Sequence, residues 1–281
     1  MPSHSPTHDL VLTGIPRSGT SLLCNLLHRY GNCVVINEPE AVSETFDRGE
    51  APRHVPGLYH ELRAAVRCGL PVRNKFRERQ VVQDTTLEHT IAAYHPVVES
   101  SDFILGTKDT LAYLTGLRTL RVAMPRARFV ACVRDPLQTI ASWKASFVHL
   151  REASLPEVFF REPSALALRD DERIALGKIE AITALPERRA QWWNFLAERI
   201  LEELEHGLTV IRYHELIQDP AAVVEGILEG WPKGSLRVPL TLNRVTRART
   251  PLEPADYEAI ADLCTQTAQA LGLPSEQPAL A

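Results

Sequence analysis

The 281-residue chain lacks several patterns that would place it in a class of protein at once. Its five cysteines are an odd number and form no C-x-x-C pair, which argues against a zinc site and a disulfide framework and suits a reducing compartment. The first apolar run, residues 10–15, is far too short for a signal sequence or a membrane span. We therefore expect a soluble, cytoplasmic protein with no metal site and no membrane contact.

The chain also lacks an excess of basic residues. Lysine and arginine number 31 against 35 aspartates and glutamates, a formal net charge of −4, and this balance argues against a nucleic-acid partner. Hydrophobic residues make up 44%, enough for a sizeable core. No repeat, low-complexity tract or linker is evident, so we expect a single domain over residues 1–281.

Short apolar runs alternate with helical patterns along the chain. Runs that are apolar on both faces predict buried strands at 10–13, 33–36, 103–105, 128–133 and 208–211. Helical spacing predicts helices at 21–30, 110–124, 137–150 and 187–206, with another after Asp219 and Pro220. This alternation is typical of an α/β protein, here a P-loop-like fold in three layers with a central parallel sheet flanked by helices.

Two regions, 44–101 and 151–186, fit this alternation poorly. Both are rich in arginine, glutamate and proline, and we expect helical and loop insertions that cap the site and bind the acceptor. The basic residues of the first region are interpreted as a solvated helix face; they are Arg53, Arg63, Arg67, Arg73, Lys75, Arg77 and Arg79. Trp192 and Trp193 are interpreted as core residues rather than a platform for ligand stacking.

A glycine-rich loop, G-I-P-R-S-G-T-S at residues 14–21, lies between the first predicted strand and helix. Its glycines and Ser21 fall where a nucleotide-triphosphate loop, G-x-x-x-x-G-K-[ST], has them, and backbone N–H groups at a helix start bind anions. Thr20 stands in place of the lysine that reaches the β- and γ-phosphates, which disfavours ATP and GTP. Arg17 places a cation inside the loop instead. The alternative is a tight turn that binds no ligand.

Residues 16–21 match at every position the loop P-[KR]-[ST]-G-[TS]-[TS] of sulfotransferases that use 3′-phosphoadenosine 5′-phosphosulfate (PAPS). The chain resembles that family in a second motif too: Arg134 ends a predicted strand and Ser142 follows eight residues later on a helix. The resemblance implies that Arg134 and Ser142 bind the 3′-phosphate. It also implies that the other end of PAPS is held by Arg17, Ser18, Gly19, Thr20 and Ser21.

Three further segments resemble the branch that includes the tyrosylprotein sulfotransferases. Glu38 follows the second predicted strand, where that branch has its catalytic base. Lys108 stands in a Lys-Asp pair whose lysine stabilises the transferring group, and Tyr213 stands in an Arg-Tyr segment beside the nucleotide. Arg247, within residues 243–249, is matched to the loop that closes over PAPS, with a solvated basic turn as the alternative.

The resemblance implies direct in-line transfer of a sulfuryl group to a hydroxyl or amine of a small-molecule or peptide acceptor. Glu38 would accept the acceptor's proton, while Arg17 and Lys108 would neutralise charge on the sulfuryl oxygens. The product is 3′-phosphoadenosine 5′-phosphate (PAP), and no metal is required. Glu40 is the rival base. Four histidines of the first insertion are interpreted as surface or loop residues: His54, His60, His89 and His95.

Two other functions stay open. A P-loop small-molecule kinase would use ATP, which Thr20 in the lysine position opposes. A catalytically silent nucleotide-binding protein would have no need of Arg17, Glu38 and Lys108 together. The sequence leaves open the oligomeric state and whether the acceptor is a phenol, alcohol, sugar, amine or peptide.

Overall fold

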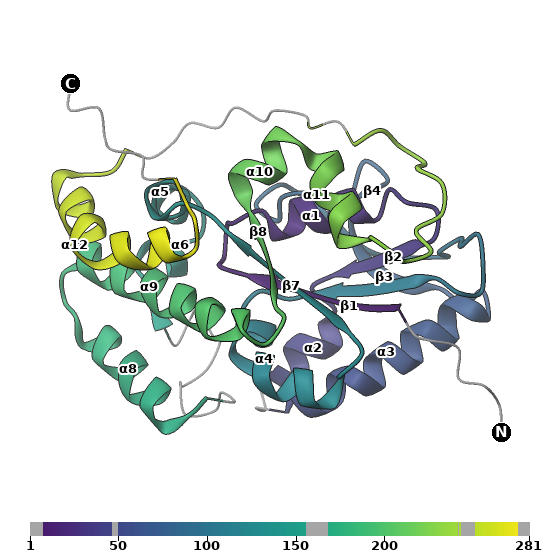
Figure 1. The fold of residues 1–281 in the computed structure, drawn as a ribbon, viewed down its shortest axis with the longest axis horizontal. Helices are drawn as coiled ribbons and strands as arrows, with labels where there is room; N and C mark the ends of the chain where they lie inside the picture. The colour runs from purple at the N-terminus through teal and green to yellow at the C-terminus, as the bar shows by residue number, and fades with distance from the viewer. Residues whose placement is uncertain (1–7, 47–49, 156–167, 241, 243–250, 275–281) are drawn as a thin grey trace.

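A computed structural model describes residues 8–46, 50–155, 168–240, 242 and 251–274, which include a central sheet of five strands in the order β2-β6-β1-β7-β8 (Figure 1). Every neighbouring pair in this sheet is parallel. The strands are β1 (His8–Gly14), β2 (Cys33–Asn37), β6 (Ile104–Lys108), β7 (Arg128–Val133) and β8 (Thr209–Arg212). Each overlaps one of the five predicted strands, which confirms the predicted parallel sheet.

Successive side chains of a strand point to opposite sides of the sheet, and in these strands both sets are apolar. Helices therefore cover both faces of this sheet. Leu10 and Leu12 of β1 join one core cluster, whereas Val11 joins another. In Figure 1 one face carries α1 (Thr20–Leu27), α10 (Tyr213–Gln218) and α11 (Pro220–Ile227). The other face carries α2 (Glu40–Phe46), α3 (Ala51–Arg67) and α4 (Leu111–Ala123). The predicted three-layer arrangement is confirmed.

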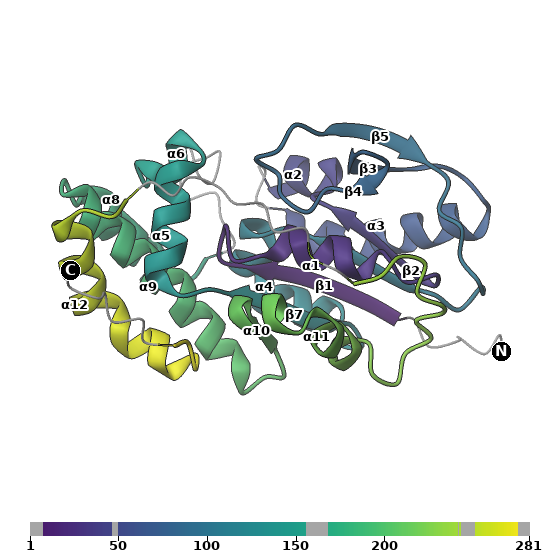
Figure 2. The ribbon, with the colours of Figure 1, turned by 90° about the horizontal axis from the view of Figure 1, so that it is seen from above.

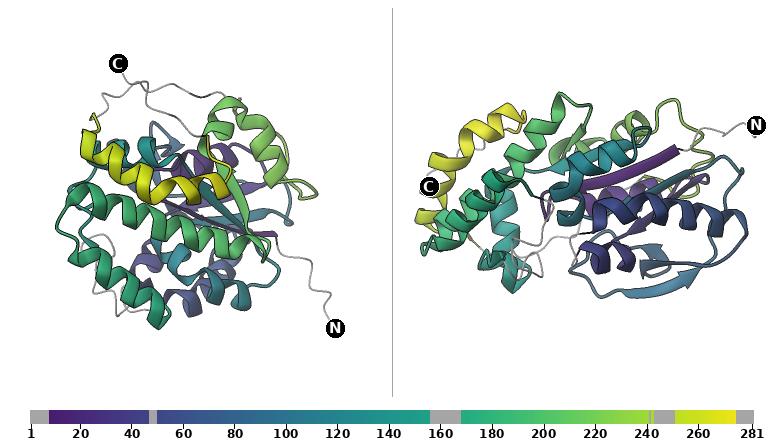
Figure 3. Two further views of the ribbon diagram at one scale, coloured as in Figure 1. Left: turned by 60° about the vertical axis from the view of Figure 1, so that its left-hand side comes forward. Right: turned by 90° about the horizontal axis from the view of Figure 1, so that it is seen from below.

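A group of helices extends the molecule at one end of the sheet. They are α5 (Pro136–Ala145), α6 (Val148–Arg151), α8 (Asp170–Ala181), α9 (Leu185–Leu204) and α12 (Pro254–Ala270). The two views in Figure 3 show α12 lying alongside α9. Trp192 and Trp193 of α9 are fully buried, and the Trp192 ring lies 4.4 Å from that of Trp143 on α5. The prediction that the tryptophan pair packs in the core is confirmed.

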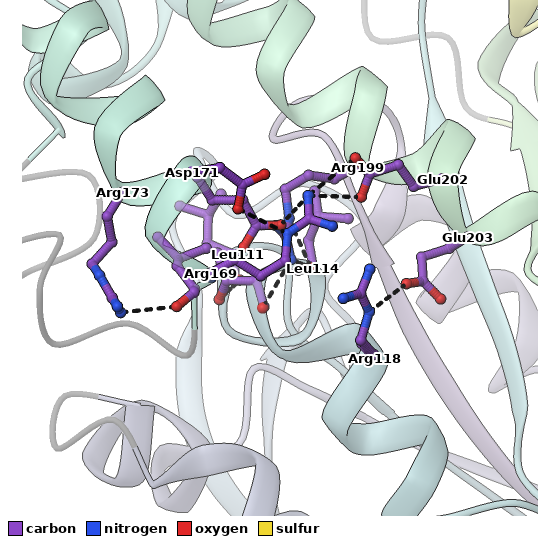
Figure 4. A network of polar contacts seen from close by, with 12 residues as sticks. Leu111, Leu114, Arg118, Arg169, Asp171, Arg173, Arg199, Glu202 and Glu203 are labelled. Carbon is purple, nitrogen blue, oxygen red and sulfur yellow. Dashed lines mark hydrogen bonds and ion pairs between the residues drawn. The ribbon is translucent and has the colours of Figure 1, made fainter.

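Charged side chains dock α8, which belongs to the second insertion, against its neighbours (Figure 4). Arg199 of α9 contacts Glu172 of α8, and it also donates to the carbonyl oxygen of Thr115 on α4 at 2.9 Å. Arg169, just before α8, pairs with Glu202 of α9 at 3.2 Å. One arginine therefore joins three helices. Among the helices described here, none is long and apolar enough to cross a membrane.

The first insertion, for which the sequence predicted only helices and loops, contains a second sheet. It is antiparallel, in the order β4-β3-β5, and consists of β3 (Val72–Arg77), β4 (Gln80–Val81) and β5 (Thr90–Tyr94). The Asn74 side chain accepts from Asn37 N at 2.9 Å and donates to Val35 O at 2.8 Å. This amide fastens the small sheet to β2, the edge strand of the large sheet, on the α2–α3 side of the molecule (Figure 2).

Five of the seven residues of the basic stretch do not belong to a solvated helix face. Arg63 of α3 is only 6% exposed, and its guanidinium donates to Phe103 O at 2.8 Å and Asp9 Oδ1 at 2.5 Å. Lys75 lies on a strand, and its side chain contacts Glu38. The interpretation holds for Arg53 and Arg67, which are exposed on α3. It is wrong for the other five residues, because Arg63 is buried, Arg73, Lys75 and Arg77 lie on β3, and Arg79 lies in a turn.

Candidate active site

All of the sequence motifs in the described residues follow the carboxyl ends of parallel strands, so they meet at one edge of the sheet. The glycine-rich loop follows β1, Glu38 follows β2, and Arg134 follows β7. Lys108 ends β6 opposite Asn37, and Tyr213 follows β8. From β1 the chain passes to β2 on one side, and it later crosses β1 to reach β7 on the other. Ligands of open α/β sheets bind where strand connections diverge in this way.

The course of the loop depends on its two glycines. Gly14 has a φ of 143°, and a Cβ there would lie 2.3 Å from Cys132 O on β7. Gly19 has a φ of 92°, and a Cβ there would lie 2.7 Å from the Tyr213 ring. Arg17 adopts a φ of 72°, a left-handed conformation that is costly for a residue with a side chain. Backbone strain of this kind is frequent in ligand-binding loops.

Neighbouring elements support the loop from behind. Trp143 Nε1 of α5 donates to Pro16 O at 2.8 Å, and Arg134 Nη1 donates to Arg17 O at 3.4 Å. Helix α1 begins at Thr20, and the first N–H groups of a helix have no acceptor within it, so they favour an anion. The Ser18 hydroxyl is fully buried and has no hydrogen-bond partner among the described residues. The loop thus offers backbone and hydroxyl donors together.

Glu38 is held between two lysines from different sheets. Lys108 Nζ lies 2.5 Å from Glu38 Oε1, and Lys75 Nζ contacts the other oxygen, Oε2. Glu38 has a φ of 52°, and its N–H donates to Lys108 O at 2.7 Å. Burial alone would raise the pKa of Glu38, but the charges and hydrogen bonds of Lys108 and Lys75 outweigh burial and lower the pKa to about 2. The carboxylate therefore stays ionised at physiological pH.

Asp109 is the second carboxyl group at this edge. Its Oδ1 accepts from Ala112 N in the first turn of α4 at 3.0 Å. Burial, followed by the negative charge of Glu38, raises the pKa of Asp109 to about 6. Asp109 is thus half ionised near pH 6, where Glu38 is fully ionised. No sequence pattern predicts a role for Asp109 of its own, because the shift in its pKa depends on burial and on a residue that follows another strand.

The guanidinium of Arg17 is paired with a carboxylate that the sequence analysis missed. Arg17 Nη1 and Nη2 lie 3.0 and 3.1 Å from the two oxygens of Asp84, which follows β4 in the small sheet. Arg17 Nε also donates to Ser142 Oγ at 3.3 Å. Burial alone would raise the pKa of Asp84, but the hydrogen bonds and charge of Arg17 outweigh burial and lower it. The structure thus brings Arg17 and Ser142 together and adds Asp84.

Arg134 and Tyr213 meet beside the loop. The Arg134 guanidinium lies 4.2 Å from the centre of the Tyr213 ring, a cation–π contact, and its Nε donates to Gln138 Oε1 at 3.2 Å. The same ring packs against Gly19. Motifs that follow β1, β7 and β8 are therefore in direct contact.

The rival bases have other partners. Glu40 is 47% exposed and pairs with Arg73 at 3.2 Å rather than with the lysines at Glu38. His54 pairs with Glu50, while His89 and His95 contact the carbonyl oxygens of Leu87 and Gly69. His60 is exposed on α3. Arg247 lies outside the described residues.

Comparison with known proteins decides the family. Residues 9–231 match a family model described as the sulfotransferase family. The chain belongs to the sulfotransferase family. No curated protein matches this sulfotransferase. The tyrosylprotein-like branch therefore stays a prediction.

Two solved structures are similar to this sulfotransferase over almost the whole length of both chains. A sulfotransferase from Alicyclobacillus acidocaldarius is 15% identical, with a TM-score of 0.45 over 96% of this chain and 97% of that one. The sulfotransferase domain of the Synechococcus PCC 7002 olefin synthase is 16% identical, with a TM-score of 0.43 over 96% of each chain. Within the part of the sulfotransferase that the structure describes, no group of three or more His, Cys, Asp or Glu residues could hold a metal ion.

Proposed function

We propose that this sulfotransferase transfers a sulfuryl group from PAPS, in line, to a hydroxyl or amine of an acceptor. The observation that carries the proposal is the position of Glu38: an ionised carboxylate, flanked by Lys108 and Lys75, at the same sheet edge as an anion-binding loop. A base, cations and a phosphate loop are the groups that such a transfer needs.

The loop and the contacts around it suit a donor with phosphate groups at both ends. The 5′-phosphate would be held by Ser18, Gly19, Thr20 and Ser21, and the buried Ser18 hydroxyl would then gain an acceptor. The 3′-phosphate would be held by Arg134 and Ser142, with Tyr213 beside the nucleotide. We assign Arg247 to the loop that closes over the donor. PAPS supplies an activated sulfur atom and a good leaving group.

The residues at the sheet edge suit the transfer step. The acceptor's oxygen or nitrogen bonds to sulfur as the bond from sulfur to the 5′-phosphate oxygen breaks, and PAP leaves. Glu38 accepts the acceptor's proton; each carboxylate oxygen keeps a free lone-pair direction although a lysine contacts it. Lys108 and Arg17 stabilise the negative charge on the transferring group. Arg17 exchanges its partner Asp84 for the donor in this scheme.

Ligand-induced thermal stabilisation, followed by an acceptor screen, tests this function. We expect PAP to raise the melting temperature without magnesium, because the chain has phosphate donors but Thr20 in place of the triphosphate lysine. Arg134→Met should lose the preference for PAP over AMP, since these ligands differ only in the 3′-phosphate. Labelled PAPS should then sulfate at least one of a set of phenols, alcohols, sugars, amines and peptides. Stabilisation by Mg-ATP alone would instead indicate a kinase, and PAP binding without transfer a silent binding protein.

A further inference from the structure

Glu38 has one more cation than it needs for neutralisation. Lys108, 2% exposed at the end of β6, already pairs with Oε1. Lys75 brings a second ammonium to Oε2 from β3, a strand of the small sheet. Its side chain is 16% exposed, so it forgoes most of its hydration to make this contact. Burying an ammonium group is unfavourable unless it is paired, and Glu38 is the partner of Lys75 here.

The backbone fixes Lys75 in this position. Asn74, the preceding residue, is 2% exposed, and it binds both Val35 O and Asn37 N of β2. The attachment of β3 to β2 is therefore one residue away from Lys75 and one residue away from Glu38. The attachment thus holds the backbones of Lys75 and Glu38 side by side.

Other ionisable groups around Glu38 favour a second cation. Asp109, at the end of β6, adds a negative charge that opposes ionisation of Glu38, while Cys24 of α1 is buried and neutral, with its pKa raised to about 12 chiefly by burial. Lys108 alone would face two carboxyl groups. Lys75 restores the balance, and it also fixes the plane of the carboxylate, because each oxygen now has its own partner.

We propose that Lys75 is a positioning residue for the transfer reaction: it holds Glu38 ionised and oriented to accept the acceptor's proton. The proposal rests on the proposed function above. Lys75 acts through Glu38 and not on the transferring group. The small sheet thus supplies one of the two cations that contact the proposed base.

The same strand supplies a matched control. Arg73 lies two residues before Lys75, so it projects from the same face of β3, and it pairs with Glu40, the rival base. This pair is exposed, with side-chain exposures of 62% and 47%. Arg73→Met and Lys75→Met remove the same charge from the same strand, and only the second leaves Glu38 with a single cation.

Two measurements on the full chain test the proposal. One follows the carboxyl carbon of Glu38 by ¹³C NMR during a pH titration, with the signal assigned by its loss in Glu38→Gln; the other records kcat/KM against pH with labelled PAPS. Glu38 must be ionised to accept a proton, so activity falls as the pH drops through its pKa. In Lys75→Met we expect the midpoint of the Glu38 titration to move up by about 1–3 pH units. The acidic limb of the kcat/KM profile, where activity falls with falling pH, should move up by the same amount. Glu38 stays ionised at pH 7 after this shift, so its lost orientation alone should lower kcat there, by about 10- to 100-fold with PAP affinity unchanged.

Control variants separate positioning from a general loss of structure. Lys75→Arg should restore the acidic limb, and Arg73→Met should match the wild type in both measurements. If Lys75→Met does not fold, as judged by circular dichroism, Lys75→Gln takes its place.

An unchanged titration of Glu38 in a folded Lys75 variant would overturn the proposal, as would an acidic limb that moves in Arg73→Met instead. The proposal would also be overturned if Lys75→Met raised the pKa of Glu38 in the NMR titration but left the acidic limb of the kcat/KM profile unchanged. A wild type that binds PAP but sulfates no acceptor would refute the proposed function and the catalytic role of Lys75 together. The NMR titration would still report whether Lys75 holds Glu38 ionised, so the two failures are distinguishable.

Discussion

Glu38 has its low pKa because of two side chains, and its predicted role depends on that environment. We expect Glu38→Gln to retain PAP binding and to lose about 100- to 10,000-fold in turnover, since the amide keeps the shape but cannot accept the proton. Turnover is measured with labelled PAPS, and binding by calorimetry. Glu40→Gln, which alters an exposed pair with Arg73, should stay near the wild-type rate. Near-normal turnover in Glu38→Gln would remove Glu38 from the role of base.

Asp109 has the opposite shift and a consequence for stability. Its pKa rises from 3.8 to about 6 on folding, so the folded protein binds more protons than the unfolded chain between these values. The free energy of unfolding therefore falls as the pH rises through this window. Asp109→Asn removes this pH dependence and keeps an oxygen that accepts from Ala112 N. Its free energy of unfolding, relative to that of the wild type, should therefore be about 1–3 kcal/mol higher at pH 8 than at pH 4. Urea unfolding at the two pH values measures the gain, and an equal difference at both would contradict the assigned pKa.

At the scale of elements, the loop between β1 and α1 requires a glycine at position 19. We expect Gly19→Ala to weaken PAP binding at least tenfold, because a methyl group at this left-handed position would meet the Tyr213 ring at 2.7 Å and move either the loop or the ring. Gly226→Ala in α11 is the control: no atom lies within 4 Å of its added Cβ, and alanine favours a helix. PAP binding in Gly19→Ala equal to that in Gly226→Ala would show that the loop does not need this approach.

Elements with regular apolar patterns were predictable, whereas the small sheet was not. Strand β7 was predicted at its observed bounds because five consecutive apolar residues, 129–133, carry the signal of a buried strand. Strand β3 contains Arg73, Lys75 and Arg77, which resemble a solvated surface when read alone. The side-chain amide of Asn74 joins β3 to β2 by two hydrogen bonds, and no local sequence pattern predicts such a contact. The predicted helix at 137–150 likewise divides into α5 and α6.

At the scale of the whole molecule, a buried ionic cluster fastens α12 to the rest of the protein. The Asp256 side chain has no exposed surface, and it pairs with Arg189 of α9 and Lys144 of α5, each at 2.6 Å. Asp256→Asn leaves both cations without full compensation and should cost about 3–5 kcal/mol of unfolding free energy. Glu253→Gln removes the exposed partner of the same lysine and should cost under about 1 kcal/mol. Urea unfolding measures the loss of stability in both variants. Equal losses would contradict the conclusion that burial makes the Asp256 pairs more important than the Glu253 pair.

The amino-acid sequence was sufficient for the parallel sheet and for the gathering of Glu38, Lys108 and Arg134 at one edge. Apolar runs report burial directly, and parallel strands all end on the same side, so motifs that follow strands must meet. The three-layer architecture follows from the same alternation of strands and helices.

The tertiary structure alone decided what charge state these residues have. Arg17 meets Asp84 across 67 positions of the chain, and Glu38 meets Lys75 across 37. Such contacts depend on how the small sheet docks against β2, and a pKa depends on burial and on charges within a few ångströms. The sequence therefore predicted that Glu38, Lys108 and Arg134 meet at one edge of the sheet, but not that Lys75 and Asp84 join them there. Only the folded chain lowers the pKa of Glu38 to about 2 and raises that of Asp109 to about 6.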